Sequence, residues 1–234
     1  LALAAGPAVA VEHRTSSSHE AYRTYLPGLE AMNELEFTEA ARSFERAIEI
    51  DPDFGQAYYK LAISRWWETS LNAAVLGGHA DTSAAAALHA MLDGKAKLSR
   101  KEPELGEAFR DLLHHRADEA APRFERVVAA HPDHKEAWYG LGEARFHGIQ
   151  DPDGWRGSAE ACERALTLDP SFGLALYHAI GVYIRGIHLE QRKTRSALAL
   201  VQSKHEEAGK QRDEARRQQQ IAAAVNGFLS EMLT

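Results

Sequence analysis

The sequence predicts an all-α solenoid of helix-turn-helix units, with about four and a half irregular repeats followed by a long C-terminal helix. Three observations predict this architecture. One short block occurs three times, at 44–59, 124–139 and 162–177. Each copy has a proline at the same place, and alanine residues, with an aromatic residue in two of the copies, precede that proline at helical spacing. Repeats of this kind are typical of arrays in which each unit packs on its neighbours.

Residues 1–18 are predicted to be an alanine-rich, then polar, leader or linker. Ala8-Val9-Ala10 resembles the small-residue end of a secretory signal, which favours an extracytoplasmic location. No charged segment precedes it, so a plain linker in a cytoplasmic protein is the alternative. The apolar stretch is too short to cross a bilayer, which takes about 20 residues. The helical array is predicted over 19–187.

The first copy of the block shows how a repeat is built. Ala40, Phe44 and Ala47 are spaced so that they share one face of a helix. Pro52 cannot continue that helix, because it lacks an N–H and clashes with the preceding turn. Proline is again favourable at the start of the following helix. The block therefore predicts a helix, a tight turn and another helix.

Residues 21–54 resemble one tetratricopeptide repeat of about 34 residues. The positions that carry the resemblance are Gly28, Phe37, Ala40, Phe44, Ala47 and Pro52. Further repeats are predicted to open at Gly55, at about Lys101 and at Lys135, and the first helix of a fifth follows over 173–185. More distantly, 16–28 and 97–102 are similar to the repeat regions of bacterial signalling proteins, namely transmembrane serine/threonine kinases and winged-helix regulators. The resemblance implies a bacterial regulatory or scaffolding setting.

Two insertions make the array irregular. Pro52 and Pro132 are further apart than two 34-residue repeats require, which predicts extra residues near 68–81. Asn72 and the Gly77-Gly78 pair are expected to break any helix there. The following helix, about 82–92, is alanine-rich. A shorter insertion is predicted near 148–154, where Asp-Pro-Asp-Gly indicates a turn.

The family resemblance implies a concave groove lined by the first helix of each repeat. Aromatic residues recur at the expected groove positions, and large rings suit peptide binding. The alternative is that these rings only pack between repeats. We expect removal of the Tyr59 and Tyr139 rings together to abolish partner capture and leave the helices intact. The predicted groove consists of Tyr25, Tyr59, Trp66, Phe109, Tyr139, Phe146 and Tyr177.

Composition and motifs favour no enzymatic class. The net charge of −7 gives no reason to expect nucleic acid as a ligand. No glycine-rich phosphate loop, nucleophile elbow or His-Glu-x-x-His motif occurs, so neither catalytic residues nor a cofactor is predicted. Histidines at 114, 115, 131 and 134 invite a metal hypothesis, but they form no evident ligand set. The single cysteine, Cys162, replaces the aromatic residue of the other blocks and is predicted to be buried.

The predicted function is that of a protein–protein interaction scaffold that holds a partner peptide or helix in the aromatic groove. The main alternative is a structural subunit of a homo-oligomeric or multi-protein assembly. A weaker alternative is a small-molecule sensor that uses the same groove. The mass of the purified chain in solution separates the first two.

The tail, 188–234, is predicted to be a long helix over about 188–229, with Gly209 as the place of any interruption. Leu189, Leu198 and Val201 are expected to cover the last repeat. The end of the tail carries an apolar face that has nothing nearby to bury against. We expect this face to dock on another chain, on a second copy or on a further domain, with membrane attachment as the weaker alternative. Its residues are Ile221, Val225, Phe228 and Met232.

Overall fold

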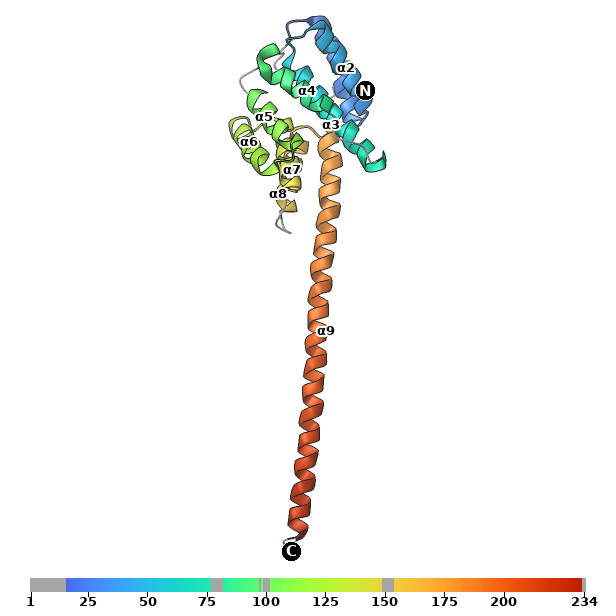
Figure 1. Ribbon diagram of the computed structural model, residues 1–234, viewed down its shortest axis with the longest axis vertical. Helices are drawn as coiled ribbons and strands as arrows, with labels where there is room; N and C mark the ends of the chain where they lie inside the picture. Colours follow the sequence, from blue (N-terminus) through green and yellow to red (C-terminus); the bar gives the residue numbers. More distant parts are fainter. Residues whose placement is uncertain (1–15, 77–81, 97, 99–101, 149–153, 233–234) are drawn as a thin grey trace, which may run out of the picture. The chain divides into compact units, whose positions relative to one another are not determined.

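The chain folds as helices, with no strand among the residues that the computed structural model describes, 16–76, 82–96, 98, 102–148 and 154–232 (Figure 1). The predicted all-α solenoid is therefore confirmed. The bounds are α1 His19–Asn33, α2 Phe37–Ile50, α3 Gly55–Leu76, α4 Thr82–Ala90, a π-helical turn η1 Met91–Lys95, α5 Glu102–Leu113, α6 Ala117–Ala130, α7 Lys135–His147, α8 Trp155–Leu168 and α9 Gly173–Met232.

The chain consists of two compact units. The first covers residues 1–184 and holds α1 to α8 with the first turns of α9, and the second covers 185–234. Helix α9 has 60 residues and continues through Gly209, so no interruption occurs there. A glycine inside a helix costs only about 1 kcal/mol relative to alanine, and its neighbours here are mostly strong helix formers. The fifth repeat thus has a first helix and no turn after it.

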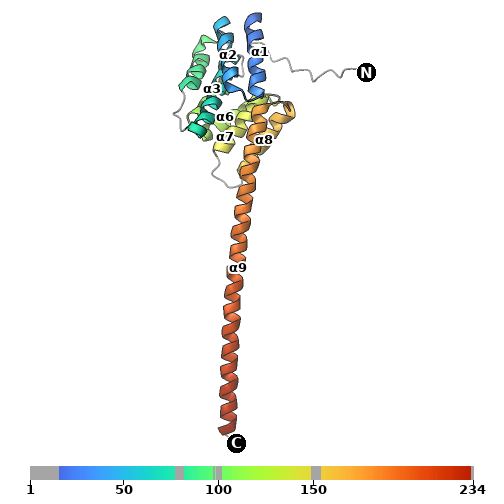
Figure 2. The same ribbon diagram turned by 90° about the vertical axis from the view of Figure 1, so that its right-hand side faces the viewer.

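Consecutive helices of the first unit pack as hairpins, which Figure 2 shows for α1 and α2. The turn inside a repeat is tight. Leu35 between α1 and α2 and His115 between α5 and α6 occupy corresponding places and adopt positive φ angles of 65° and 58°. The amide that follows each of them donates back to the helix, from Glu36 to Ala31 and from Arg116 to Asp111.

The turns between repeats are built alike at three places. The first residue after each helix donates its N–H to a carbonyl four residues back, from Asp51, His131 and Asp169. Three residues later, the N–H of Phe54, His134 or Phe172 donates to that same first residue. These bonds satisfy groups that a helix end leaves unpaired. The shared proline therefore marks one turn structure used three times.

Close helix contacts inside a repeat depend on small residues. A β-carbon added at Gly28 in α1 would lie 2.6 Å from Cε1 of Phe44 in α2. One added at Gly142 in α7 would lie 2.6 Å from Sγ of Cys162 in α8. Phe44 and Cys162 are fully buried. The first and second helices of these repeats can approach closely because the first helix presents no side chain there.

Helix α3 differs from the sequence-based prediction. It runs to Leu76, so Asn72 does not break it, and that part of the prediction is wrong. Asparagine is only a mildly unfavourable helix residue, and good helix formers surround it. Of the predicted insertions near 68–81 and 148–154, residues 77–81 and 149–153 lie outside the described residues, and 68–76 belong to α3. Helix α4 with η1 occupies the predicted alanine-rich segment.

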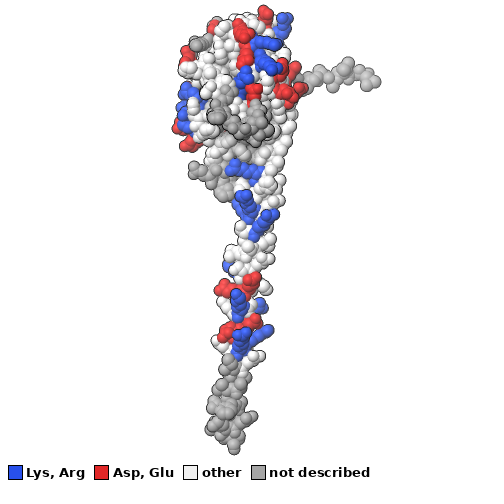
Figure 3. Space-filling model, turned by 45° about the vertical axis from the view of Figure 1, so that its right-hand side comes forward, with Lys and Arg blue, Asp and Glu red and all other residues white. Residues whose placement is uncertain are grey.

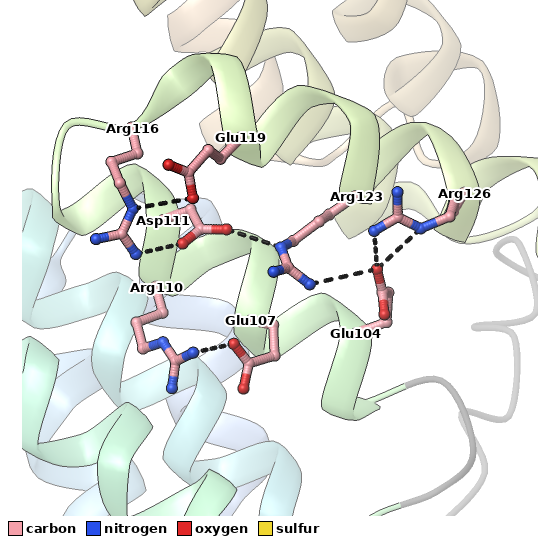
Figure 4. A network of polar contacts seen from close by, with 8 residues as sticks. All are labelled: Glu104, Glu107, Arg110, Asp111, Arg116, Glu119, Arg123 and Arg126. Carbon is pink, nitrogen blue, oxygen red and sulfur yellow. Dashed lines mark hydrogen bonds and ion pairs between the residues drawn. The ribbon is translucent and has the colours of Figure 1, made fainter.

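Ion pairs join α5 to α6 on the surface of the third repeat (Figure 4). Asp111 is 2% exposed on its side chain and lies between Arg116 and Arg123, with Nε of Arg123 2.8 Å from Oδ2. Glu104 in α5 pairs with Arg126 in α6 at 2.6 Å. The buried carboxylate is thus satisfied from two sides, as a charge removed from water requires.

The first and last repeats of the array meet within the first unit. A β-carbon added at Gly173, where α9 begins, would come within 2.8 Å of the carbonyl carbon of Asn33 at the end of α1.

The described part of the chain begins at Ser16, and Ser18 caps α1 by accepting a hydrogen bond from the N–H of Ala21 at 3.1 Å. The predicted signal-like segment, 8–10, lies outside the described residues. No helix in the described part of the chain is both long and apolar enough to cross a membrane.

Candidate functional site

The predicted groove residues divide into two groups by burial. Tyr25, Tyr59, Phe109 and Tyr139 are each at most 4% exposed, so they lie inside the array. Trp66 and Phe146 are partly exposed, and Tyr177 is 45% exposed. The four buried rings offer almost no surface to a partner in this structure. Only the other three remain available for contact.

Tyr25 and Tyr139 pack beneath the turns between repeats, whereas the Tyr59 ring lies 5.8 Å from that of Phe109 in the next repeat, between centroids. Tyr25 lies with its ring centroid 4.9 Å from that of Phe54, the residue that ends the first turn. Tyr139 lies 5.5 Å from Phe172, which has the corresponding place in the last turn. Aromatic pairs at these separations stabilise the contact beyond simple burial. The recurrence of tyrosine therefore reflects packing between repeats.

The inner helices also contact one another across non-adjacent repeats. Nζ of Lys60 in α3 lies 2.9 Å from Oε1 of Glu136 in α7, and both side chains are 7% exposed. His134 approaches the same carboxylate at 3.2 Å. Burial by itself raises the pKa of Glu136, but the positive charge of Lys60 and a hydrogen bond from His134 outweigh it and lower the pKa well below its usual value. This ion pair fixes α3 against α7.

A buried polar network lies beside this pair, and the sequence analysis missed it. Trp67 donates its indole N–H to the Tyr139 hydroxyl at 2.7 Å, and that hydroxyl donates to Glu143 at 2.8 Å. Nδ1 of His178 in α9 lies 2.9 Å from Oε1 of Glu143, and Nε2 of His147 lies 3.3 Å from Oε2. The network links α3, α7 and the first turns of α9.

Glu143 is charged although its side chain is only 1% exposed. Burial raises its pKa, but the charge of His178 and hydrogen bonds from His147 and His178 outweigh burial and lower the pKa to about 2. A signal for the network existed in the sequence. The corresponding place in the first three repeats holds Leu29, Ile63 and Phe109, so a glutamate there is a polar residue at a core position.

The partly exposed rings form a surface that we call the aromatic platform, defined as Trp66, Phe146, His147 and Tyr177. Trp66 lies 6.3 Å from His147, and Phe146 lies 5.4 Å from His147, between ring centroids. Tyr177 connects to Trp66 through Trp67, at 5.5 Å from each of the two rings to that of Trp67. The His147 side chain is 52% exposed. The platform therefore joins α3, α7 and the start of α9, with the Glu143 network beneath it.

A separate shallow pocket of about 390 Å³ lies between α2, α3 and α4. None of the predicted groove residues lines it. Its walls combine aliphatic and aromatic side chains, such as Leu61 and Tyr58, with the carboxylates of Glu45 and Glu49. Arg65 lies at its edge and pairs with Glu45 and Glu68. The mixed lining and the ion pairs indicate a surface depression that is part of the packing between these helices.

The remaining sequence predictions for sites have the following places. Cys162 is buried, as expected for a small apolar residue. No group of three or more His, Cys, Asp or Glu residues in the described ranges has a geometry that suits a metal ion. Ile221, Val225, Phe228 and Met232 belong to α9, but their side chains lie outside what is described. Leu198 and Val201, predicted to cover the last repeat, are 58% and 64% exposed and lack the burial that this role requires.

Comparison with known proteins identifies a matching family profile and similar solved structures. The chain titled "MamA RS-1 ArsTM double mutant" is similar over 76% of this chain and 98% of its own length, with 18% identical residues and a TM-score of 0.35. A comparison with curated proteins gives no match. The sequence profile described as Tetratricopeptide repeat matches residues 114–171, from the end of α5 to the turn before α9. The segment 114–171 is thus similar to tetratricopeptide repeats, and it lies within an array of helix pairs of that kind.

Proposed function

We propose that this protein is an interaction scaffold that binds a peptide or a helix of a partner protein on the aromatic platform. The observation that carries the proposal is the platform itself: exposed ring surface of Trp66, Phe146 and Tyr177 around the exposed imidazole of His147. Tryptophan and tyrosine dominate the binding energy of protein interfaces, because they bury a large area and lose little side-chain entropy. A bacterial signalling setting is a further proposal that rests on the resemblance of 16–28 and 97–102.

The buried part of the cluster supports this role by holding the platform rigid. Trp67 lies directly beneath the exposed rings and is fixed by its hydrogen bond to Tyr139. Phe146 packs against His178 at 4.9 Å, and His178 is held by Glu143. A surface that is already ordered before binding loses less entropy when a partner docks.

The test uses peptides selected from a displayed random library for binding to the parent chain. Trp66→Ala with Phe146→Ala should weaken these peptides by about 30-fold or more, as loss of an aromatic anchor does. The matched control is Leu26→Ala with Ile50→Ala, which removes exposed apolar surface elsewhere. Equal binding by the platform variant and the parent would refute the proposal. Circular dichroism confirms that each variant keeps its helices.

The double substitution of Tyr59 and Tyr139 by alanine does not isolate partner binding from folding. Both rings are buried, and the Tyr139 hydroxyl is part of the Glu143 network. Their removal would open cavities and leave the indole N–H of Trp67 without its acceptor. Loss of binding in that variant would therefore report loss of the fold.

A further inference from the structure

Helix α9 carries an exposed stripe with the spacing of a coiled coil. Apolar residues alternate at intervals of three and four, interrupted by two polar residues at the centre. The stripe, which we call the seam, consists of Ile180, Ile184, Ile187, Gln191, Thr194, Leu198 and Val201. All seven side chains are exposed, and the five aliphatic ones by 51% to 64%. Spacing of this kind is the pattern by which helices supercoil around one another.

The seam residues are divided between the two units at residue 184. Ile180 and Ile184 belong to the first unit, and the other five residues belong to the second. All of them lie on α9, which is one helix from Gly173 to Met232. The exposure of a single aliphatic side chain needs no explanation, but five of them at one helical register do.

A second helix of the ordinary repeat type does not fit on this face. Ile180 has the place that small residues hold in the first helices of the other repeats, namely Gly28, Ala62, Ala108 and Gly142. At Gly28 and Gly142, even a β-carbon would lie 2.6 Å from the second helix. An isoleucine at this place therefore excludes the close approach seen inside those repeats. Coiled coils instead hold large aliphatic side chains between helix axes about 8–10 Å apart.

A stretch of α9 without charged side chains supports an apolar contact. Figure 3 shows a band without Lys, Arg, Asp or Glu on this part of α9, between two groups of charged side chains. In the sequence this band is 196–203, which separates Arg195 from Lys204. Leu198, Leu200 and Val201 within it are exposed by 58%, 58% and 64%. A solvated spacer helix would not be expected to expose three large aliphatic residues within one turn.

Charge and polarity along the seam select a second copy of this chain in parallel orientation. In a parallel pair Gln191 faces Gln191, so that the two side-chain amides can hydrogen-bond to each other. Thr194 faces Thr194, and its hydroxyl already donates to the Glu190 carbonyl of its own helix at 3.0 Å. The same alignment brings Glu190 of one helix to Arg195 of the other, the position at which coiled coils form interhelical salt bridges. Two antiparallel alignments of the helices would keep most of the seam in contact. One sets Gln191 against Ile187 and the other sets Ile180 against His205, so each places a polar side chain against an aliphatic one.

We propose that the seam is a self-association surface, through which copies of this chain form a parallel coiled coil. This goes beyond binding at the aromatic platform, and each can fail without the other. The residues at 180, 187, 194 and 201 share one of the two core positions of the coiled-coil repeat, and all four are β-branched. Such residues at this position favour assemblies of three or four helices over pairs. The apolar face predicted to dock lies at 221–232, whereas the seam lies closer to the repeats.

Light scattering on the purified 234-residue chain tests association. We expect an integral multiple of the 25.8 kDa chain mass. Leu198→Glu with Val201→Glu should reduce the assembly to one chain, because it places charges in the seam. The matched control, Ser196→Glu with Ser203→Glu, adds the same charge on the opposite face of α9 and should keep the parent mass. The proposal is overturned if the parent is monomeric at all concentrations across a 100-fold range in the micromolar region. It is also overturned if the seam variant assembles as the parent does.

Disulfide trapping tests the orientation. Leu198→Cys should form a disulfide-linked pair of chains in a mild oxidant, because parallel helices bring the two positions within the 4.4–6.8 Å between Cα atoms that the bond needs. Antiparallel helices would hold them more than about 15 Å apart. Ser196→Cys is the control and should not link. Cys162 gives a low background, since it is buried and burial raises its thiol pKa to about 12. Linkage only at Ser196→Cys, or at neither position, overturns the parallel seam.

Discussion

At the scale of single residues, small or charged groups at core positions decide whether two helices can pack. Gly28 leaves room for the Phe44 ring, and Glu143 is tolerated in the core because three side chains, two imidazoles and a hydroxyl, surround its carboxylate. Removing a buried charge from its partners, or adding a single carbon at a tight contact, has an effect out of proportion to its size.

Gly28→Ala should destabilise the array by about 1–3 kcal/mol, because the new methyl group must displace the Phe44 ring in a packed core. Gly209→Ala is the matched control. Nothing lies within 4 Å of a β-carbon added there, and it replaces a helical glycine. The urea midpoint of the array should fall for the first variant and stay constant for the second. A Gly28→Ala midpoint equal to that of the parent would show that α1 and α2 are not packed as described.

Glu143→Gln should make stability less dependent on acid pH. The folded pKa of Glu143, about 2, lies below its ordinary value of 4.5. Its charged form therefore stabilises the fold above pH 4.5, and this stabilisation, roughly 3 kcal/mol, is lost as the pH falls from 4.5 to 2. Urea unfolding at pH 6 and at pH 3 measures the change. The difference between parent and variant should shrink at pH 3.

Glu39→Gln is the control for this pH experiment, because the Glu39 side chain is 61% exposed and pairs only with a nearby arginine on its own helix. Its unfolding free energy should follow that of the parent at both pH values. A parent–Glu143→Gln difference that is the same at pH 6 and pH 3 would contradict the charged state assigned to Glu143.

At the scale of elements, one hairpin of helices and one turn are repeated, and tertiary contacts then join hairpins that are distant in the chain. Phe44 and Phe124 fill the same place in their repeats, and both are completely buried. The Lys60–Glu136 pair and the Trp67–Tyr139 hydrogen bond connect α3 to α7 and pass over an intervening repeat. The array is therefore more tightly coupled than one in which each repeat touches only the next.

Phe124→Ala should lower the free energy of unfolding by about 3–5 kcal/mol, because it leaves a cavity between α6 and α7. Phe146→Ala removes a ring of the same size that is partly exposed, and should cost clearly less. Both are measured by urea denaturation followed by circular dichroism at 222 nm. Equal losses for the two variants would argue against the assigned burial of Phe124.

At the scale of the whole molecule, the first unit has a core of its own and the second is a single helix. The hydrophobic core consists of residues from the first unit. Residues of the second unit are mostly exposed where their side chains are described. Helices in proteins gain most of their stability from packing against other elements. A helix that is exposed along most of its length therefore needs a partner to be stable there.

Truncation after Gln202 separates the two surfaces predicted for α9. The seam ends at Val201, so the shortened chain should form an assembly with the same number of chains as the parent and keep the urea midpoint of the array. Any partner that binds through Ile221 and the apolar residues after it should be lost. Light scattering and urea denaturation are the measurements. A shortened chain that is monomeric, beside an assembled parent, would assign self-association to 203–234.

The repeat architecture was predictable from the sequence alone because it depends on local rules. The shared proline, the alanines of the second helices and Gly28 fix helix ends and helix faces without reference to distant residues. The end of α2 before Pro52 and the burial of Cys162 followed from the same rules. Helix α3 was predicted too short, since the sequence does not show that a mild helix breaker such as Asn72 lies within a long packed helix.

The candidate site depended on tertiary structure. The sequence indicated which rings recur, but Tyr25, Tyr59 and Tyr139 became core residues, whereas Trp66 and Phe146 kept exposed surface. The difference arises from contacts between residues far apart in the chain, such as Trp67 with Tyr139. Likewise, the seam spacing is written in the sequence, but only the folded chain leaves Ile180 and Ile184 uncovered, because no second helix follows in the fifth repeat. Local patterns determine helices, and burial is decided by which helices meet.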